Sequence, residues 1–130
     1  MKIKLLSIVV DDQQKAVDFY TGILGFMKTQ DIPVGEYRWI QIASPEGGDA
    51  EISLEPNVNP AAKTYQSALF EQGIPYTAFE VDDLESEFQR LSDLGVEFTT
   101  KPMNAGGVEM AVFEDTCGNL IQIYQSDRSA

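Results

Sequence analysis

Two short segments of the chain place carboxylates, a hydroxyl and a phenol at alternate positions. Residues 51–55 read EISLE and residues 76–80 read YTAFE. Because alternate side chains of an extended strand share one face, Glu51, Ser53 and Glu55 would lie on a single surface. Oxygen ligands of this kind suit a hard cation such as Mg²⁺ or Mn²⁺, and a carboxylate or a phenol could also act as a general acid or base.

The chain contains no histidine. Histidine is the commonest transition-metal ligand and general base, and it activates the nucleophile in Ser-His and Cys-His catalysis, so those classes of site are excluded. The single cysteine, Cys117, cannot form a disulfide within the chain, which agrees with a reducing compartment. It lies in the sequence DTCGN, and we interpret it as a turn residue. A reactive thiol is the alternative, but no neighbouring cation is visible to activate it.

The only tryptophan, Trp39, alternates with isoleucines in the sequence YRWIQIA. If Ile40 and Ile42 pack on a helix, Trp39 and Gln41 face the opposite side of the strand. An indole on that side offers a stacking surface for a flat or cationic ligand. The alternative is a core tryptophan that is buried against another part of the protein.

The elements that would position these side chains occur twice. Residues 9–26 read VVDDQQKAVDFYTGILGF, and residues 80–98 read EVDDLESEFQRLSDLGVEF. In each copy an aspartate pair precedes an amphipathic stretch with helical spacing. We expect Asp11 or Asp12 to cap the first helix and Asp82 to cap the second.

Glycines and prolines mark the ends of the other expected elements. Gly25 and Gly95 follow the two helices, where a left-handed residue commonly ends a helix. Asn59 and Pro60 begin a connecting helix. One strand is expected before each helix and three strands after it. The predicted strands are 2–10, 26–30, 37–43 and 50–55 in the first copy and 75–81, 96–100, 108–114 and 119–125 in the second, with residues 31–36 and 101–107 as connecting turns.

These elements predict an α+β fold made of two βαβββ modules. We expect residues 1–130 to form a single domain, with module one at about 1–58, the connecting helix at about 59–73 and module two at about 74–130. Agreement in helix starts, helix ends and the following three strands favours a true internal repeat over two similar helices that arose independently.

The formal net charge of the chain is -12, and only nine lysines and arginines are present. Nucleic acids and anionic membranes are bound through basic residues, so neither is an expected partner. No apolar run is long enough to cross a bilayer, and the N-terminus lacks the features of a signal peptide. We therefore expect a cytoplasmic protein, and the acidic charge is compatible with a cationic or neutral small molecule.

Two of these motifs resemble those of a known family. VDDQQKAVDFYTGILGF is similar to the first-module signature of the vicinal oxygen chelate superfamily, which includes glyoxalase I, extradiol dioxygenases and bleomycin-resistance proteins. VFEDTCGNLIQIYQ is similar to the terminal hairpin of that superfamily. The resemblance covers nearly the whole chain and implies a curled mixed sheet around a cleft. It specifies the fold better than the chemistry, because one scaffold hosts several activities.

The resemblance also implies where metal ligands would stand. In metal-dependent members, the first strand of each module carries a histidine and the last strand carries a carboxylate. The corresponding residues here are Leu5, Ser53, Tyr76 and Gln122. None of these side chains is an anionic ligand, so we expect no metal of the family type and no other cofactor. A hard-cation site formed by Glu51, Glu55 or Glu80 stays open, and the alternative is that these glutamates lie in water at the rim of the cleft.

The resemblance, together with the alternation of side chains along the strands, predicts the residues that line the ligand-binding cleft. They are Leu5, Ser7, Trp39, Gln41, Glu51, Ser53, Tyr76, Glu80 and Gln122. No catalytic residue is assigned.

Two functions of different classes remain. The favoured one is a metal-free binding protein with an acidic and aromatic cleft that sequesters a small molecule, as bleomycin-resistance proteins do with cationic drugs. The alternative is a glyoxalase- or dioxygenase-type enzyme, either with unusual carboxylate ligands or with Glu51, Glu80 or Tyr76 as acid or base. The resemblance also implies a homodimer, in which a second subunit covers open sheet edges. A subunit whose role is assembly with another chain is a third possibility.

Overall fold

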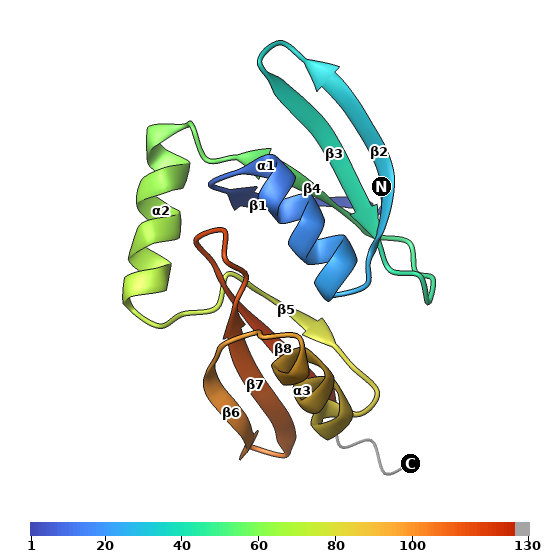
Figure 1. The fold of residues 1–130 in the computed structure, drawn as a ribbon, viewed down its shortest axis with the longest axis vertical. Coiled ribbons are helices and arrows are strands. Elements are labelled where there is room, and N and C mark those ends of the chain that lie inside the picture. The colour runs from blue at the N-terminus through green and yellow to red at the C-terminus, as the bar shows by residue number, and fades with distance from the viewer. Residues whose placement is uncertain (127–130) are drawn as a thin grey trace. The chain divides into compact units, whose positions relative to one another are not determined.

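The computed structural model describes residues 1–126, which fold as two compact units, residues 1–66 and the segment from Ser67 onward (Figure 1). The first unit contains β1 (Leu5–Val10), α1 (Gln13–Val17), the π-helical segment η1 (Asp18–Ile23), β2 (Met27–Val34), β3 (Tyr37–Ala43) and β4 (Glu51–Pro56). The second contains β5 (Thr77–Glu80), α3 (Leu84–Asp93), β6 (Phe98–Ala105), β7 (Val108–Glu114) and β8 (Leu120–Ser126). Helix α2 (Pro60–Glu71) joins them along the chain.

The two units repeat one topology. Each has its own four-stranded mixed sheet, in the order β1-β4-β3-β2 in the first unit and β5-β8-β7-β6 in the second. The first and last strands of each unit are parallel, and the other neighbours are antiparallel. The predicted α+β fold with a duplicated βαβββ unit is therefore confirmed.

The helix in each unit begins at an aspartate with extended backbone. Asp12 accepts a hydrogen bond from the Lys15 N–H at 2.9 Å, and Asp83 accepts one from the Ser86 N–H at 3.0 Å. This bond to the Ser86 N–H lowers the pKa of the Asp83 carboxyl. The prediction that Asp82 caps the second helix is wrong by one residue, because only Asp83 reaches the free amides of the first turn.

Both helices end at the predicted glycines, with φ of 94° at Gly25 and 88° at Gly95. The first helix widens before it ends. Within η1 the Leu24 N–H donates to the Phe19 carbonyl, five residues earlier, at 3.0 Å. The Thr21 hydroxyl donates to the Val17 carbonyl at 2.6 Å, which satisfies an acceptor in the preceding turn.

The outer strands β2 and β6 are longer than predicted. The residues expected as turns after them continue the strands to Val34 and Ala105, through Pro33 and Pro102. Both strands lie at the edge of their sheet, where a residue without an N–H can be placed without loss of a sheet hydrogen bond. The prediction that residues 31–36 and 101–107 are connecting turns is therefore wrong for residues 31–34 and 101–105.

One face of each sheet packs on a helix and forms the core. In the first unit the fully buried residues include Ile8, Val10, Ile40, Ile42 and Leu54 from the strands, with Ala16 and Tyr20 from the helical segment. In the second unit Phe113 contacts the ring of Phe98 edge to face, and Phe98 contacts Phe88 of α3 in the same manner. Burial of these apolar side chains supplies the main stabilisation of each unit.

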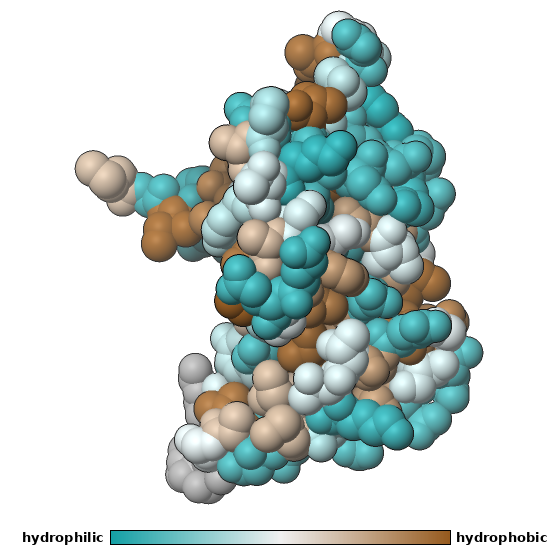
Figure 2. Space-filling model, turned by 90° about the vertical axis from the view of Figure 1, so that its left-hand side faces the viewer, coloured by the Kyte–Doolittle hydropathy of each residue, from teal (hydrophilic) through white to brown (hydrophobic). Residues whose placement is uncertain are grey.

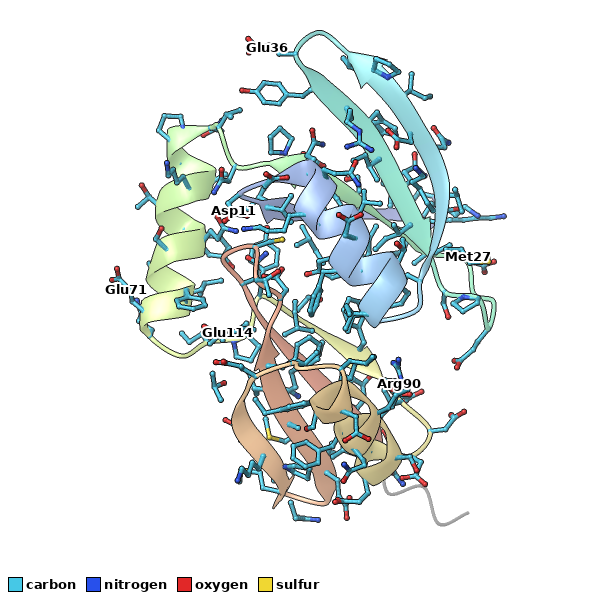
Figure 3. The ribbon with its side chains drawn as sticks, viewed as in Figure 1. Asp11, Met27, Glu36, Glu71, Arg90 and Glu114 are labelled. Carbon is cyan, nitrogen blue, oxygen red and sulfur yellow. The ribbon has the colours of Figure 1, made fainter. Side chains whose placement is uncertain are left out.

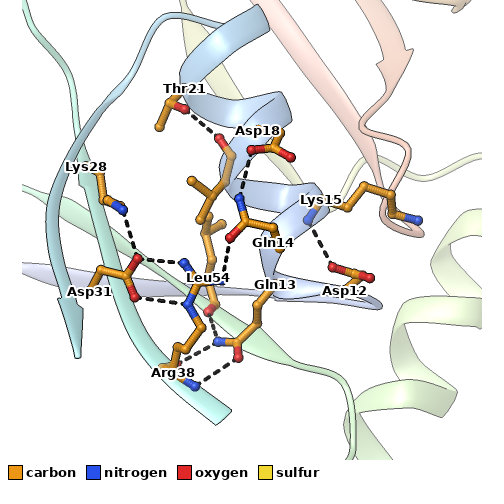
Figure 4. Close-up of polar contacts among 11 residues, drawn as sticks. Asp12, Gln13, Gln14, Lys15, Asp18, Thr21, Lys28, Asp31, Arg38 and Leu54 are labelled. Carbon is orange, nitrogen blue, oxygen red and sulfur yellow. Dashed lines mark hydrogen bonds and ion pairs between the residues drawn. The ribbon is translucent and has the colours of Figure 1, made fainter. Parts of the chain in front are cut away.

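A polar network joins the start of α1 to the hairpin formed by β2 and β3 (Figure 4). The Gln13 amide donates to the Arg38 carbonyl at 2.7 Å and to the Leu54 carbonyl at 2.9 Å, and it accepts from the Arg38 N–H at 3.0 Å. The Arg38 guanidinium binds both oxygens of Asp31, at 3.0 and 2.6 Å. These bonds hold Arg38 on the helix side of β3, so its neighbour Trp39 faces the opposite side.

Figure 3 places Met27 at the start of β2 and Glu36 in the turn that joins β2 to β3.

The asparagine at position 59 caps α2 as predicted, since its side chain accepts from the Ala61 N–H at 2.9 Å. The last four residues of the expected second module lie outside the described residues.

Candidate functional site

The side of the first sheet that faces away from α1 carries most of the sequence-predicted site residues. We call it the polar face, and it consists of Leu5 and Ser7 on β1, Trp39 and Gln41 on β3, and Glu51, Ser53 and Glu55 on β4. Ser53 is the central position, because it lies opposite Ser7 on one side and Gln41 on the other. The structure therefore brings together the predicted residues of the first unit.

Two serine hydroxyls meet one carboxylate on this face. Ser7 Oγ donates to Glu55 Oε2 at 2.5 Å, and Ser53 Oγ lies 2.6 Å from the same oxygen. The two hydroxyl oxygens are 3.3 Å apart. Ser53 is 1% exposed, so its hydroxyl is held in place, whereas Ser7 lies at the surface. Hydrogen bonds to an ionised acceptor are among the stronger ones in proteins, and these fix the position of the Glu55 carboxylate.

A second network connects an indole to a carboxylate. Trp39 Nε1 donates to Gln41 Oε1 at 2.7 Å, and Gln41 Nε2 donates to Glu51 Oε1 at 3.2 Å. Thr29 Oγ1 of β2 donates to the same Glu51 oxygen at 2.5 Å. Trp39 is 39% exposed. It is therefore not a fully buried core residue, which was one of the two alternatives left open by the sequence.

The two glutamates share one feature. Each receives both of its donors on a single oxygen: Oε2 in Glu55 and Oε1 in Glu51. Within residues 1–126 no donor is recorded for the other oxygen of either carboxylate. A carboxylate with about four acceptor positions can take further donors there. The face is therefore able to accept hydrogen bonds or a positive charge from a ligand.

The same geometry bears on the hard-cation hypothesis. Glu51 and Glu55 are four residues apart on one strand, a separation of about 13 Å along its axis. Ligands of one calcium or magnesium ion lie about 2.0–2.6 Å from it. Glu55 is held by Ser7 and Ser53, and Glu51 is held by Thr29 and Gln41, so the two carboxylates do not converge on one ion. Across the described part of the chain, no group of three or more acidic or cysteine side chains is placed to hold a metal.

The second unit presents different chemistry at matching positions. Gln122 on β8 lies opposite Ala78 and Val112, just as Ser53 lies opposite Ser7 and Gln41. Tyr76 precedes β5, and its N–H donates to the Leu120 carbonyl at 2.8 Å. Glu80 accepts a hydrogen bond from Ser126 Oγ at 3.4 Å. Tyr76, Glu80 and Gln122 thus belong to this unit.

One residue of the polar face was missed by sequence reasoning. Thr29 lies where the register of β2 shifts between Lys28 and Gln30, and this bulge directs its hydroxyl to Glu51. No turn residue or glycine marks the bulge, so the sequence gives no signal for it. Cys117 lies in the turn between β7 and β8 as predicted, fully buried, and its N–H donates to the Asp115 carboxylate at 2.7 Å.

Comparison with known proteins agrees with this architecture. Residues 2–123 match the family model of the glyoxalase/bleomycin resistance protein/dioxygenase superfamily. The chain belongs to that superfamily. The resemblance drawn from the sequence motifs is therefore confirmed. Among relatives, the uncharacterized protein YurT of Bacillus subtilis strain 168 is 53% identical over 126 residues, which cover 96% of this chain and 99% of YurT.

Solved structures of other proteins share the fold of this superfamily protein. UcmS2 is 26% identical with a TM-score of 0.82, and the match covers 95% of this chain and 97% of UcmS2. TnmS3, described as an antibiotic binding protein from Streptomyces sp. CB03234, is 28% identical with a TM-score of 0.78, covering 98% and 97% of the two chains. No helix within residues 1–126 is both long and apolar enough to cross a membrane.

Proposed function

We propose that this protein binds a small molecule that carries a cationic or hydrogen-bond-donating group, and that the polar face of the first sheet recognises that group. The observation that carries the proposal is the arrangement of Glu51 and Glu55. Both carboxylates are held by hydroxyl or amide donors on one oxygen, and the other oxygen is available to a ligand. A fixed acceptor loses little conformational entropy when it binds, which favours recognition.

Three further observations support this function. The exposed Trp39 indole lies on the same face as Glu51 and can stack on a flat or cationic group. The net charge of -12 attracts cations over distances of about 10 Å at ordinary salt concentrations. TnmS3, which has the same fold, is described as an antibiotic binding protein. The superfamily scaffold is thus compatible with binding of a small organic compound.

We propose that recognition does not use a bound metal. The positions at which metal-dependent members of the family carry ligands hold Leu5 and Ser53 in the first unit, and Tyr76 and Gln122 in the second. A hydrocarbon, a neutral hydroxyl, a phenol and an amide do not balance the charge of a divalent cation. The hydroxyl of Ser53 is also engaged by Glu55.

The sequence and the edge strand β1 suggest further properties of this protein. We propose one domain, a cytoplasmic location and a homodimer, with no nucleic acid or membrane partner. Strand β1 is an edge strand with exposed Leu5 and Leu6, and Ile3 precedes it, so a second subunit could cover this edge. The lone buried cysteine agrees with a reducing compartment.

The function is tested by NMR titration with two probes of similar shape, the aromatic cation 2-phenylethylammonium and the neutral 2-phenylethanol. The wild-type protein is expected to bind the cation more tightly, and the preference should weaken at high salt. Glu51→Gln and Glu55→Gln should each reduce the preference. Glu36→Gln is the matched control, because it removes one charge from the exposed β2–β3 turn, away from the polar face. Equal affinity for the two probes in the wild-type protein would contradict the proposal.

A further inference from the structure

Gln41 is the only side chain recorded between the indole of Trp39 and the carboxylate of Glu51 among the described residues. Its amide oxygen accepts from Trp39 Nε1 at 2.7 Å, and its amide nitrogen donates to Glu51 Oε1 at 3.2 Å. An amide group is planar, so the two bonds set the directions of both neighbours at once. Rotation of the amide by half a turn would place its NH₂ group against the indole N–H and break both bonds.

The duplicated fold indicates that this network is not needed to build the sheet. In the first sheet Gln41 lies opposite Ser53 of β4, and in the second sheet Val112 lies opposite Gln122 of β8. Val112 therefore occupies the position that matches Gln41. In the same way Met110 matches Trp39, and Leu120 matches Glu51. The second unit forms the same topology with apolar residues at all of these positions. Trp39, Gln41 and Glu51 are therefore not required by this topology.

We propose that Gln41 is a positioning residue that couples the stacking surface of Trp39 to the charge-accepting group of Glu51. The inference rests on the proposed binding function and specifies its ligand class. One ligand would place a flat apolar ring on Trp39 and a cationic or N–H donor group at the free oxygen of Glu51. Gln41 holds the ring and the carboxylate in a fixed mutual orientation, so selectivity for ligands that carry both groups depends on it.

The shape of the neighbouring surface agrees with this ligand class. Ile32 lies opposite Trp39 across the β2–β3 hairpin, and Val34 lies opposite Tyr37. These four side chains share the face of Trp39 and are between 39% and 58% exposed. Figure 2 shows apolar residues at the upper end of the molecule, the end at which Figure 1 places the turn between β2 and β3. An apolar surface thus adjoins Trp39 on the side away from Glu51.

The coupling can be read without any ligand, because Trp39 is the only tryptophan in the chain and gives a single indole N–H resonance. Gln41→Val introduces the residue that the second unit carries at the matching position. It should shift the indole resonance and increase its exchange with solvent, since the acceptor is lost. Glu51→Gln should shift the same resonance when Gln41 is present and leave it unchanged in the Gln41→Val background.

Two variants separate positioning from a structural effect. Gln41→Glu keeps an acceptor for Trp39 but replaces the donor to Glu51 with a second carboxylate, so the indole should remain hydrogen-bonded while the bond to Glu51 is lost. Gln30→Leu is the matched control, because Gln30 lies opposite Gln41 on β2 and is exposed. It should leave the indole resonance in place. An indole resonance that is insensitive to Gln41→Val, or that responds to Glu51→Gln equally in both backgrounds, would overturn the inference.

Binding of the two probes completes the test. Gln41→Val should reduce the preference for 2-phenylethylammonium over 2-phenylethanol about two- to fivefold, the range expected for loss of one exposed cation–π or charged contact. Affinity for the neutral alcohol should change less. An unchanged preference in Gln41→Val would also overturn the inference. If the wild-type protein binds neither probe, that result contradicts the proposed function. The coupling between Trp39 and Glu51 is still tested separately by the indole resonance.

Discussion

Ser53 and Glu55 lie two residues apart on β4, and the buried hydroxyl of Ser53 is 2.6 Å from the Glu55 carboxylate. The buried Ser53 hydroxyl thus lies at the centre of the sheet and holds the Glu55 carboxylate, which lies closer to the surface of the protein. Ser7 approaches the same carboxylate from the neighbouring strand β1. A ligand group that binds Glu55 would meet a carboxylate that is already oriented.

This relationship predicts a difference between the two serines. Ser53→Ala removes a buried donor to a charged acceptor, so the free energy of unfolding should fall by about 1–2 kcal/mol. Ser7→Ala removes an exposed donor, and the fall should be about 0.5 kcal/mol or less. Urea denaturation of both variants measures the difference. Equal losses would show that Ser53 is not the more constrained partner.

The glycine that ends the first helix provides a second prediction. Gly25 has a φ of 94°, so Gly25→Val should lower the free energy of unfolding by about 1 kcal/mol or more. Gly22→Ala is the matched control within the same segment. Gly22 does not have a positive φ, and a Cβ there would meet no atom within 4 Å. Thermal unfolding of Gly25→Val at the wild-type temperature would contradict the assigned role.

The ion pair between Asp31 and Arg38 predicts a dependence of stability on pH. Hydrogen bonds from Arg38 and then Lys28 lower the pKa of the Asp31 carboxyl well below its ordinary value. The stabilisation is therefore present above about pH 4, the ordinary aspartate value in an unfolded chain, and it is lost as the pH falls further toward the lowered native pKa.

The measurement compares the free energy of unfolding of Asp31→Asn with that of the wild-type protein from pH 7 to pH 2.5. The difference should be constant near neutrality and should shrink below about pH 4. In an Arg38→Gln background the effect of Asp31→Asn should be smaller at every pH. A difference that grows as the pH falls would reverse the sign and exclude this assignment.

Metal ions provide the next prediction. Zn²⁺, Ni²⁺, Fe²⁺, Mg²⁺ and Mn²⁺ should not raise the melting temperature relative to protein treated with a chelator. An ion that bound only the folded protein would stabilise it by about 2.7 kcal/mol at a hundredfold excess over Kd. If one ion per subunit does bind, Glu51→Ala and Glu80→Ala would show whether it uses those carboxylates. Loss of binding in either variant would favour the enzymatic alternative.

The proposed homodimer can be checked by sedimentation. The wild-type protein should sediment as a dimer at micromolar concentration, and Leu6→Lys should shift it toward the monomer by adding a charge at the exposed edge strand β1. Val58→Lys is a control at an exposed apolar residue outside the strands. A wild-type monomer at this concentration would exclude the proposal.

Much of the fold could be predicted from the sequence, because its signals are local. Alternation of apolar residues placed Ile40 and Ile42 in the core and Trp39 on the other side, and the structure agrees. Both helix-ending glycines have the expected conformation. The predicted strand ends at residues 30 and 100 are wrong, because a proline such as Pro33 or Pro102 is compatible with both a turn and an edge strand.

The site was less predictable because its contacts depend on register. The sequence placed Glu51, Ser53 and Glu55 on one face, but it could not pair Glu55 with Ser7, which is 48 residues away. The contact between Thr29 and Glu51 depends on a bulge without a sequence signature. Asp82 and Asp83 are adjacent and of the same type, so the sequence did not show which of them caps the second helix.

The widened turn η1 also bears on the history of the duplication. In the first copy, the helix-ending Gly25 follows the N-cap Asp12 by thirteen positions. In the second copy, Gly95 follows the N-cap Asp83 by twelve positions. The first copy therefore holds one residue more between two equivalent landmarks, and a turn closed by a five-residue rather than a four-residue hydrogen bond accommodates one residue more. The extra residue is absorbed inside the helix, so the strand that follows enters its sheet in the same order in both copies. A difference of one residue, which would rotate an ordinary helix by about 100°, is thus accommodated without a change of topology.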